Sequence, residues 1–302
     1  MIAEADTAVC GSLADSYDPA TPPAYDHIIV IMDENLSYAT WLTPNLKTQM
    51  PYTHSISAAC GSEGYMHAAT HPSVNNYAAA TSGLGADYSG SDNIFHQSDV
   101  PGSSWVNYAE SESTPCQQRH VDPYKTGHVP AFQYSDIRRT TCPLFQLPMD
   151  ARFDSAVESD SLPAYTWISP NECHGTYWVS GCPGTKANRY VAGDAWLQGL
   201  LPRLFAMPSY AGGRTLIILT WDEGNKTVPH GVDCADPAVY AIDGNSCAIP
   251  TIVMSAYIRP GMLDTSDQNT YSLLGTTEDM LGFPRLNQAA TYPQSLRPGL
   301  GF

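Results

Sequence analysis

The sequence has few basic residues and a large excess of acidic ones. Its 302 residues include 14 Lys and Arg against 30 Asp and Glu, and the formal net charge is −16. Nucleic-acid backbones and anionic membrane surfaces are bound through basic patches that offset the phosphate charge. We therefore expect no nucleic-acid partner, and no membrane surface as a bulk partner.

Long apolar segments are also missing. A membrane-spanning helix needs about 20 consecutive apolar residues, whereas the strongest runs, Ile28–Met32 and Leu216–Trp221, have the length of a strand. No integral membrane segment is expected. The N-terminal Met-Ile-Ala-Glu-Ala-Asp has none of the features of a signal peptide. We interpret Met1 as a start residue placed before a mature secreted sequence whose leader has been removed.

The eight cysteines form no C-x-x-C pair, so neither redox nor zinc chemistry is indicated. An even number of scattered cysteines is typical of disulfides in an extracellular or periplasmic protein. We expect four disulfides, with local bridges from Cys173 to Cys182 and from Cys234 to Cys247. The alternative is eight buried free thiols in a cytosolic protein. The cysteines are Cys10, Cys60, Cys116, Cys142, Cys173, Cys182, Cys234 and Cys247.

Strand and helix patterns alternate along most of the chain. The expected strands are His27–Met32, Ala164–Ser169, Thr215–Trp221 and Pro250–Ser255, and the expected helices are Pro51–Ala59, Val74–Ser82, Gly193–Ala206 and Leu273–Leu281. This alternation predicts one α/β domain with a parallel sheet over residues 27–302, preceded by an N-terminal arm over residues 1–26. Residues 84–150 have little periodicity, and we expect an irregular insertion of loops and short helices there.

Two of the strongest strands end in side chains that suit a metal ion. Glu34 and Asn35 follow the first strand, and Asp222 and Glu223 follow the third. The carboxyl ends of parallel strands lie at the same edge of a sheet, so these oxygens can converge on one hard cation. Polar residues are also common at strand ends without any ligand, which is the alternative.

Ser73 stands at the expected start of the helix that Gly83 closes. The unpaired N–H groups and the dipole at a helix N-terminus favour an anion there. A serine hydroxyl becomes a nucleophile when a base or a metal lowers its pKa. The alternative for Ser73 is an ordinary N-cap residue worth about 1 kcal/mol of helix stability.

Histidines are the third element of the predicted site. Imidazole is a suitable general acid for a leaving alkoxide near neutral pH. His128, His174 and His230 are the candidates for this role, ahead of His27, His96 and His120. His71 is expected either to line the site or to shape the turn before Ser73.

Seven segments resemble, in the same order, those of the phosphoesterase family that contains bacterial secreted acid phosphatases and phospholipases C. They are HIIVIMDENLSY, ATHPSVNNYAAATSG, HVPAFQY, GDAWLQGLLPRLF, LTWDEGN, IPTIVMSAYIRPG and SLLGTTEDMLGFPRL, and they span residues 27–286. That family belongs to the alkaline-phosphatase superfamily. The resemblance implies a three-layer αβα sandwich around a mostly parallel sheet, a Ser or Thr nucleophile and a divalent metal.

The resemblance also implies roles for individual residues. The interval from Ser73 to Gly83 matches that from the superfamily nucleophile to its glycine, so Thr70 is the second choice. Glu34-Asn35 and Asp222-Glu223 match the Glu-Asn and Asp-Glu pairs of the family. The family usually has Pro at the position of Asn75, and its stretch corresponding to residues 170–174 is longer, which weakens the alignment of His174.

The expected function is metal-dependent hydrolysis of phosphate monoesters through a phosphoserine intermediate at Ser73. The oxygen-rich ligand set favours Ca²⁺, Mg²⁺ or Mn²⁺, and Zn²⁺ if a histidine joins it. The substrate would be a small phosphate ester or a phospholipid head group. One alternative is a phospholipase C-type phosphodiesterase. Another is a secreted metal- or anion-binding protein that lacks catalysis.

Overall fold

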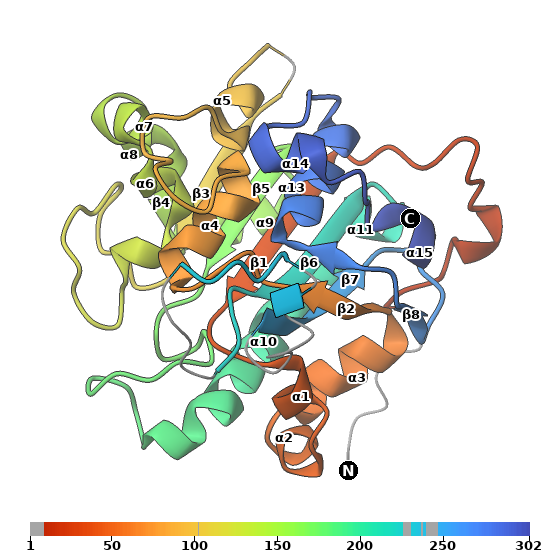
Figure 1. Ribbon diagram of the computed structural model, residues 1–302, viewed down its shortest axis with the longest axis horizontal. Coiled ribbons are helices and arrows are strands. Elements are labelled where there is room, and N and C mark those ends of the chain that lie inside the picture. Colours follow the sequence, from red (N-terminus) through yellow and green to blue (C-terminus); the bar gives the residue numbers. More distant parts are fainter. Residues whose placement is uncertain (1–8, 102, 226–230, 237, 240–246) are drawn as a thin grey trace.

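The computed structural model describes residues 9–101, 103–225, 231–236, 238–239 and 247–302. Within these residues nine strands form one sheet, whose order is β4-β3-β5-β1-β6-β7-β2-β8, with β9 beside β2 (Figure 1). The strands are β1 (His27–Asp33), β2 (Gly61–His67), β3 (Trp105–Ala109), β4 (Gln146–Pro148), β5 (Tyr165–Ser169), β6 (Thr215–Trp221), β7 (Ala248–Met254), β8 (Met262–Asp264) and β9 (Gln268–Asn269).

The sheet is mostly parallel, as predicted. Strand β1 lies at its centre and is parallel to both β5 and β6, and it is buried along nearly its whole length. Strand β7 runs antiparallel to both of its neighbours, β6 and β2. The apolar pattern of β7 shows that the strand is buried but carries no information on its direction, so this reversal could not be predicted.

The two faces of the sheet can be told apart from two residues of β1. Val30 and Asp33 are three positions apart in the strand and therefore point to opposite faces. Trp167 of β5 is in register with Val30, and Trp221 of β6 is in register with Asp33. The two tryptophans therefore lie on opposite faces.

Helices cover both faces, which gives the predicted three layers (Figure 1). Tyr77 of α4 lies 6.0 Å from Trp167 between ring centres, and Trp41 of α1 lies 6.0 Å from Trp221. Helices α6, α13 and α14 join the α4 layer, and α2, α3 and α10 join the α1 layer. The helices are α1 (Tyr38–Trp41), α2 (Pro44–Gln49), α3 (Pro51–Ala59), α4 (Ser73–Ser82), α5 (Ile94–Ser98), α6 (Pro130–Gln133), α7 (Ser135–Arg139), α8 (Cys142–Phe145), α9 (Ala151–Glu158), α10 (Arg189–Phe205), α11 (Pro208–Ala211), α13 (Thr270–Leu281), α14 (Asn287–Thr291) and α15 (Arg297–Leu300), with short 3₁₀ turns at Ala14–Ser16, Thr126–His128 and Lys186–Asn188.

The segment 84–150 was predicted to be an irregular insertion of loops and short helices. It also contains two strands of the main sheet, β3 and β4, so the prediction is wrong at these two places. Strand β3 is fully buried between β4 and β5, and it extends the main sheet. Its sequence, WVNYA, was missed because Asn107 interrupts the apolar run. In the structure the Asn107 amide donates to Ser169 Oγ at 3.3 Å, so the polar residue is satisfied inside the sheet.

All eight cysteines form disulfides, as predicted. The bridges are Cys10–Cys60, Cys116–Cys142, Cys173–Cys182 and Cys234–Cys247, and both expected local pairings are confirmed. The first bridge ties the segment before β1 to the end of α3. None of the helices in the described part of the chain is long and apolar enough to cross a membrane.

Candidate active site at the carboxyl ends of β1 and β6

The structure brings the two predicted ligand pairs together. Strands β1 and β6 are neighbours in register, so both end at the same edge of the sheet. The backbone N–H of Asn35 donates to Asp222 Oδ1 at 2.8 Å, and the N–H of Leu36 donates to the Glu223 carbonyl at 3.0 Å. Asn35 adopts the left-handed conformation, with φ of 53°, which turns the chain sharply after the strand.

Ser73 lies between these two strand ends. Its hydroxyl donates to Glu34 Oε2 at 3.1 Å and to Glu223 Oε1 at 3.3 Å. Pro72 occupies the N-cap position of α4, and Ser73 is the first helical residue, so its side chain does not act as the cap. The Thr70 hydroxyl instead donates to the carbonyl of His71, at 3.3 Å.

Asn76 holds the turn that leads into α4. Its side-chain oxygen accepts hydrogen bonds from the N–H groups of Ala69 and Thr70, at 2.9 and 3.0 Å, and its amide donates to the Thr70 carbonyl at 2.7 Å. Asn76 is fully buried, so these bonds are shielded from water. The side chain therefore fixes the position of the residues just before Ser73.

Several side chains hold Glu34 in place. Tyr77, one helical turn after Ser73, donates its hydroxyl to Glu34 Oε1 at 2.7 Å. His128 places Nε2 3.2 Å from the same oxygen, and its ring stacks on that of Tyr77. The Asn35 amide donates to Oε2 at 2.8 Å. Tyr77 was not among the predicted site residues, although its i+4 spacing from Ser73 places both on one face of the predicted helix.

Negative charge is concentrated at this edge of the sheet, and the basic residues that contact it in the described chain are histidines, not Lys or Arg. Asp33, Glu34, Asp222 and Glu223 are all buried, and no Lys or Arg of the described chain forms an ion pair with them. Burial and then the charge of Asp222 raise the pKa of Glu34 well above its usual range. Burial and then the charge of Glu223 raise the pKa of Asp222 to about 8. Burial and then the charge of Asp222 also raise the pKa of Asp33 well above its usual range.

This group of side chains fits a hard divalent cation. Both carboxylate oxygens of Asp33 and Oδ2 of Asp222 are buried and have no hydrogen-bond partner in the described structure. Buried carboxylates are normally paired or bound to a metal, and carboxylate and amide oxygens are the donors that Ca²⁺, Mg²⁺ and Mn²⁺ prefer. The ligand atoms of these acidic side chains do not all lie within 4.8 Å of one another. Among the described residues, the groups of His, Cys, Asp and Glu that do meet this distance consist of other side chains.

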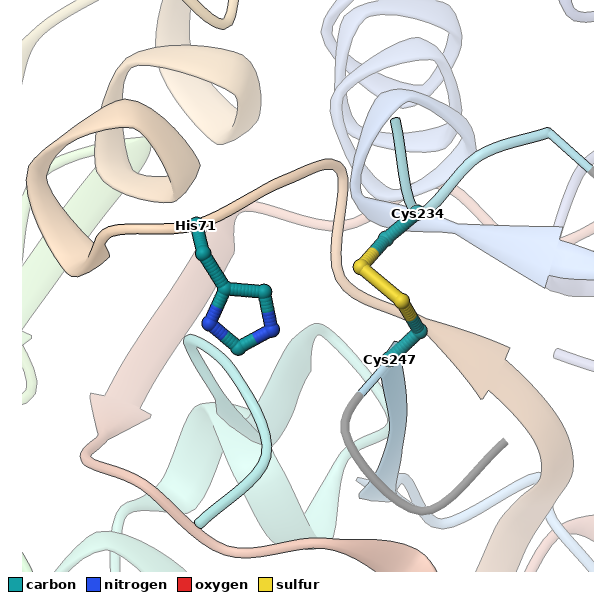
Figure 2. Close-up of side chains that lie close together, drawn as sticks. All are labelled: His71, Cys234 and Cys247. Carbon is teal, nitrogen blue, oxygen red and sulfur yellow. A yellow bond between two sulfur atoms is a disulfide. The ribbon is translucent and has the colours of Figure 1, made fainter. Parts of the chain in front are cut away.

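One of those tighter groups adjoins the site but is not a metal centre. Figure 2 shows the His71 ring beside the Cys234–Cys247 disulfide. Disulfide sulfurs are not the thiolates that bind metals. His71 instead places Nδ1 2.8 Å from Glu223 Oε2. The N–H groups of Gly231 and Cys234 donate to the carbonyls of His71 and Ala69, at 2.7 and 2.9 Å, so this segment braces the turn before Ser73.

The other predicted histidines have different surroundings. His174 lies in the loop after β5, where Nδ1 is 2.6 Å from Glu110 Oε1 and the side chain is 34% exposed. That loop contacts the site through the Gly175 carbonyl, which accepts a hydrogen bond from the N–H of Glu34 at 2.8 Å. The structure records no hydrogen bond from His174 to Ser73 or to the four ligand candidates. His230 lies outside the described residues.

Comparison with known proteins finds two distant relatives that are named as an acid phosphatase and a probable acid phosphatase. The chain is 28% identical over 177 residues to an acid phosphatase of Aspergillus fumigatus, and 27% identical over 180 residues to a probable acid phosphatase of Kluyveromyces lactis. These alignments cover 52% and 53% of this chain but only 37% and 39% of those proteins, so the similarity spans well under half of their length.

The fold is shared with an alkaline-phosphatase-superfamily protein of Vibrio parahaemolyticus, with a TM-score of 0.56, 12% identity, and coverage of 94% of this chain and 74% of that one. This likeness confirms the alkaline-phosphatase-like architecture. Residues 47–284 match the Phosphoesterase family, a span that includes Ser73, Asp222 and Glu223 but begins after Glu34 and Asn35. Since that match covers most of the sequence, the chain belongs to the Phosphoesterase family.

Proposed function

We propose that this protein hydrolyses phosphate monoesters through a covalent phosphoserine at Ser73. The observation that carries the proposal is the position of the Ser73 hydroxyl, which starts a ten-residue helix and contacts both Glu34 and Glu223. The N–H groups of the first turn of α4 suit a phosphate anion at this position. The names of the two acid phosphatase relatives favour monoesters over diesters.

The proposed metal ligands are Glu34, Asn35, Asp222 and Glu223. A divalent cation bound there would offset the carboxylate charge, lower the pKa of the serine hydroxyl and stabilise charge that develops on the phosphoryl oxygens. The donor atoms favour Ca²⁺, Mg²⁺ or Mn²⁺. His71 and His128 contact two of the carboxylates and could extend the set toward Zn²⁺ by rearranging.

The protein's own residues have distinct tasks in the proposed reaction. Ser73 attacks phosphorus in line with the leaving group, and its proton passes to one of the carboxylates that already accepts it. Tyr77 and His128 hold Glu34 in place. We assign the proton donor for the leaving alkoxide to His174, because its ring is partly exposed, Glu110 contacts its Nδ1, and the next residue, Gly175, accepts a hydrogen bond from the N–H of Glu34. His230 remains a second candidate from the sequence.

Water then attacks the phosphoserine from the opposite side and releases phosphate, with the histidine now accepting a proton. We further propose that the protein acts outside the cytoplasm, in the extracellular space or the periplasm. The four disulfides support this location, because they persist in oxidising compartments.

The central test compares Ser73→Ala with Thr70→Val. We expect Ser73→Ala to abolish hydrolysis of p-nitrophenyl phosphate and Thr70→Val to retain it. Mass spectrometry of acid-quenched wild type should find phosphate on the peptide that contains Ser73. Near-wild-type turnover by Ser73→Ala would refute the assignment. Parallel assays with bis-p-nitrophenyl phosphate and phosphatidylcholine distinguish a monoesterase from a diesterase.

Chelation tests the metal. Treatment with EDTA should abolish turnover, and the addition of one divalent ion at a time should restore it. Asp222→Asn should lose both the activity and the bound ion. Full activity after exhaustive chelation would contradict the metal assignment. The role of Ser73 as the nucleophile would still be decided by the Ser73→Ala experiment.

A further inference from the structure

We infer that His120, Asp122 and Glu172 form a second metal site, specific for a transition ion such as Zn²⁺ and separate from the proposed active-site metal. Their ligand atoms all lie within 4.8 Å of one another. His120 Nε2 is 2.5 Å from Asp122 Oδ1. The two predicted metal positions share no residue, so this inference does not depend on the proposed function.

Glu172 distinguishes this group from an ordinary surface cluster. Its side chain is only 3% exposed, and Oε2 is buried with no hydrogen-bond partner in the described chain. Leaving a buried carboxylate oxygen unsatisfied is unfavourable, and a bound cation removes that penalty. His120 and Asp122 are about two-fifths exposed, so an ion can enter from solvent and retain water ligands.

The surrounding chain holds the three side chains in place. The N–H of Glu172 donates to the carbonyl of Pro123 at 2.9 Å, which joins the loop after β5 to the segment that carries the other two ligands. Disulfides Cys116–Cys142 and Cys173–Cys182 fasten the two segments. Asn171 adds a hydrogen bond from its amide to Ser111 Oγ at 2.9 Å. The site is therefore built by two segments that are each cross-linked.

The ligand types decide which ion binds. One imidazole and two carboxylates suit Zn²⁺ and similar transition ions, whereas Mg²⁺ and Ca²⁺ prefer sets made of oxygen alone. Two carboxylates also balance the charge of a divalent ion. Lys125 is the competitor, because its Nζ lies 3.5 Å from Glu172 Oε1. Its side chain is 39% exposed and can swing into solvent when the ion binds.

The experiment measures bound Zn²⁺ per chain after equilibrium dialysis of the full protein against micromolar Zn²⁺. We expect two ions in wild type and one in His120→Ala and in Glu172→Gln. The double variant Glu34→Gln/Asp222→Asn should also bind one, and that ion should disappear when His120→Ala is added. Lys125→Gln should tighten binding at the second site by about tenfold, because it removes a nearby positive charge.

His96→Ala is the matched control. His96 is a similarly exposed histidine that contacts two aspartates, Asp92 and Asp136, which are also exposed. This variant should still bind two ions. A stoichiometry that His120→Ala leaves unchanged would overturn the inference, whatever the active site binds. A single Zn²⁺ that depends on His120 and survives Glu34→Gln/Asp222→Asn would support the inference, and it would show that the proposed active site does not take Zn²⁺, in line with its preference for Ca²⁺, Mg²⁺ or Mn²⁺.

Discussion

The backbone N–H of Asn35 donates a 2.8 Å hydrogen bond to the carboxylate of Asp222, 187 positions further along the chain. This bond joins the turns after β1 and β6, which carry the proposed metal ligands. It uses one oxygen of Asp222 and leaves the other buried and without a partner in the described structure. The proposed ligands are thus positioned by the backbone, and their carboxylate charge, which no Lys or Arg of the described residues offsets, is available to a cation.

The hydrogen bond from Tyr77 to Glu34 should matter for turnover. Tyr77→Phe keeps the ring and its packing on Trp167 but removes the hydroxyl that donates at 2.7 Å. A hydrogen bond to a carboxylate contributes about 1.5–3 kcal/mol, so kcat for p-nitrophenyl phosphate should fall by about tenfold or more. Steady-state kinetics measure this effect.

Tyr134→Phe is the control for Tyr77→Phe. Tyr134 is also fully buried, and its hydroxyl lies 2.6 Å from Thr81 Oγ1 on the same helix, α4. This variant should lose about 1 kcal/mol of stability and retain kcat. Equal losses of kcat in the two variants would show that Tyr77 acts only through the packing of α4.

Asn76→Ala should destabilise the protein strongly. The change removes three buried hydrogen bonds and leaves the N–H groups of Ala69 and Thr70 without their acceptor. The free energy of unfolding should fall by about 3 kcal/mol in urea titrations, and turnover should fall because the turn before Ser73 loosens. Asn75→Ala, at the partly exposed neighbouring position, should change stability by less than about 0.5 kcal/mol. Similar losses in both variants would argue against this role of Asn76.

Removal of the Cys234–Cys247 disulfide should lower kcat even under conditions where the protein stays folded. Its removal as Cys234→Ser/Cys247→Ser loosens the segment that braces Ala69 and His71. Cys10–Cys60 closes a longer loop, with a sequence separation of 50 against 13, so its removal should cost more stability in the loop-entropy view. At a temperature where both double variants are folded, kcat should fall in the first and be retained in the second. The reverse order would exclude a bracing role.

Glu63 should make stability depend on pH. It is fully buried in β2, and burial, followed by the charge of Asp264, raises its pKa from 4.5 to about 9. Between these values the folded state holds a proton that the unfolded state has released, so stability falls as pH rises, by up to about 1.4 kcal/mol per pH unit. Below pH 4.5 both states are protonated and the contribution is complete.

Glu63→Gln removes this proton linkage. Urea unfolding at pH 5 and pH 8 should show a smaller loss of stability in Glu63→Gln than in wild type, and Glu158→Gln, at an exposed position, should behave as wild type. The difference between wild type and variant isolates Glu63 from the other buried carboxylates. A parallel decline in all three proteins would mean that Glu63 is not the source.

The sequence by itself determined the strongest elements of the fold. Strands β1, β5 and β6 and helices α3, α4 and α13 were predicted to within a few residues, because their apolar periodicity and their Pro and Gly boundaries are local signals. Gly83 and Gly282 close α4 and α13 in the left-handed conformation, as a glycine at that position predicts. The polar residues at the ends of β1 and β6 were visible for the same reason.

Only the tertiary structure decided the direction of β7, the inclusion of β2 and β3 in the sheet and the partners of each histidine. Strand β2 contains two glycines and a glutamate, and Asn107 interrupts the apolar run of β3, so neither has a continuous apolar pattern. His128 contacts Glu34, which lies 94 positions earlier in the chain, and His174 contacts Glu110, which lies 64 positions earlier. Such contacts depend on which strands become neighbours, and that choice is made by packing of the whole sheet, which no local pattern encodes.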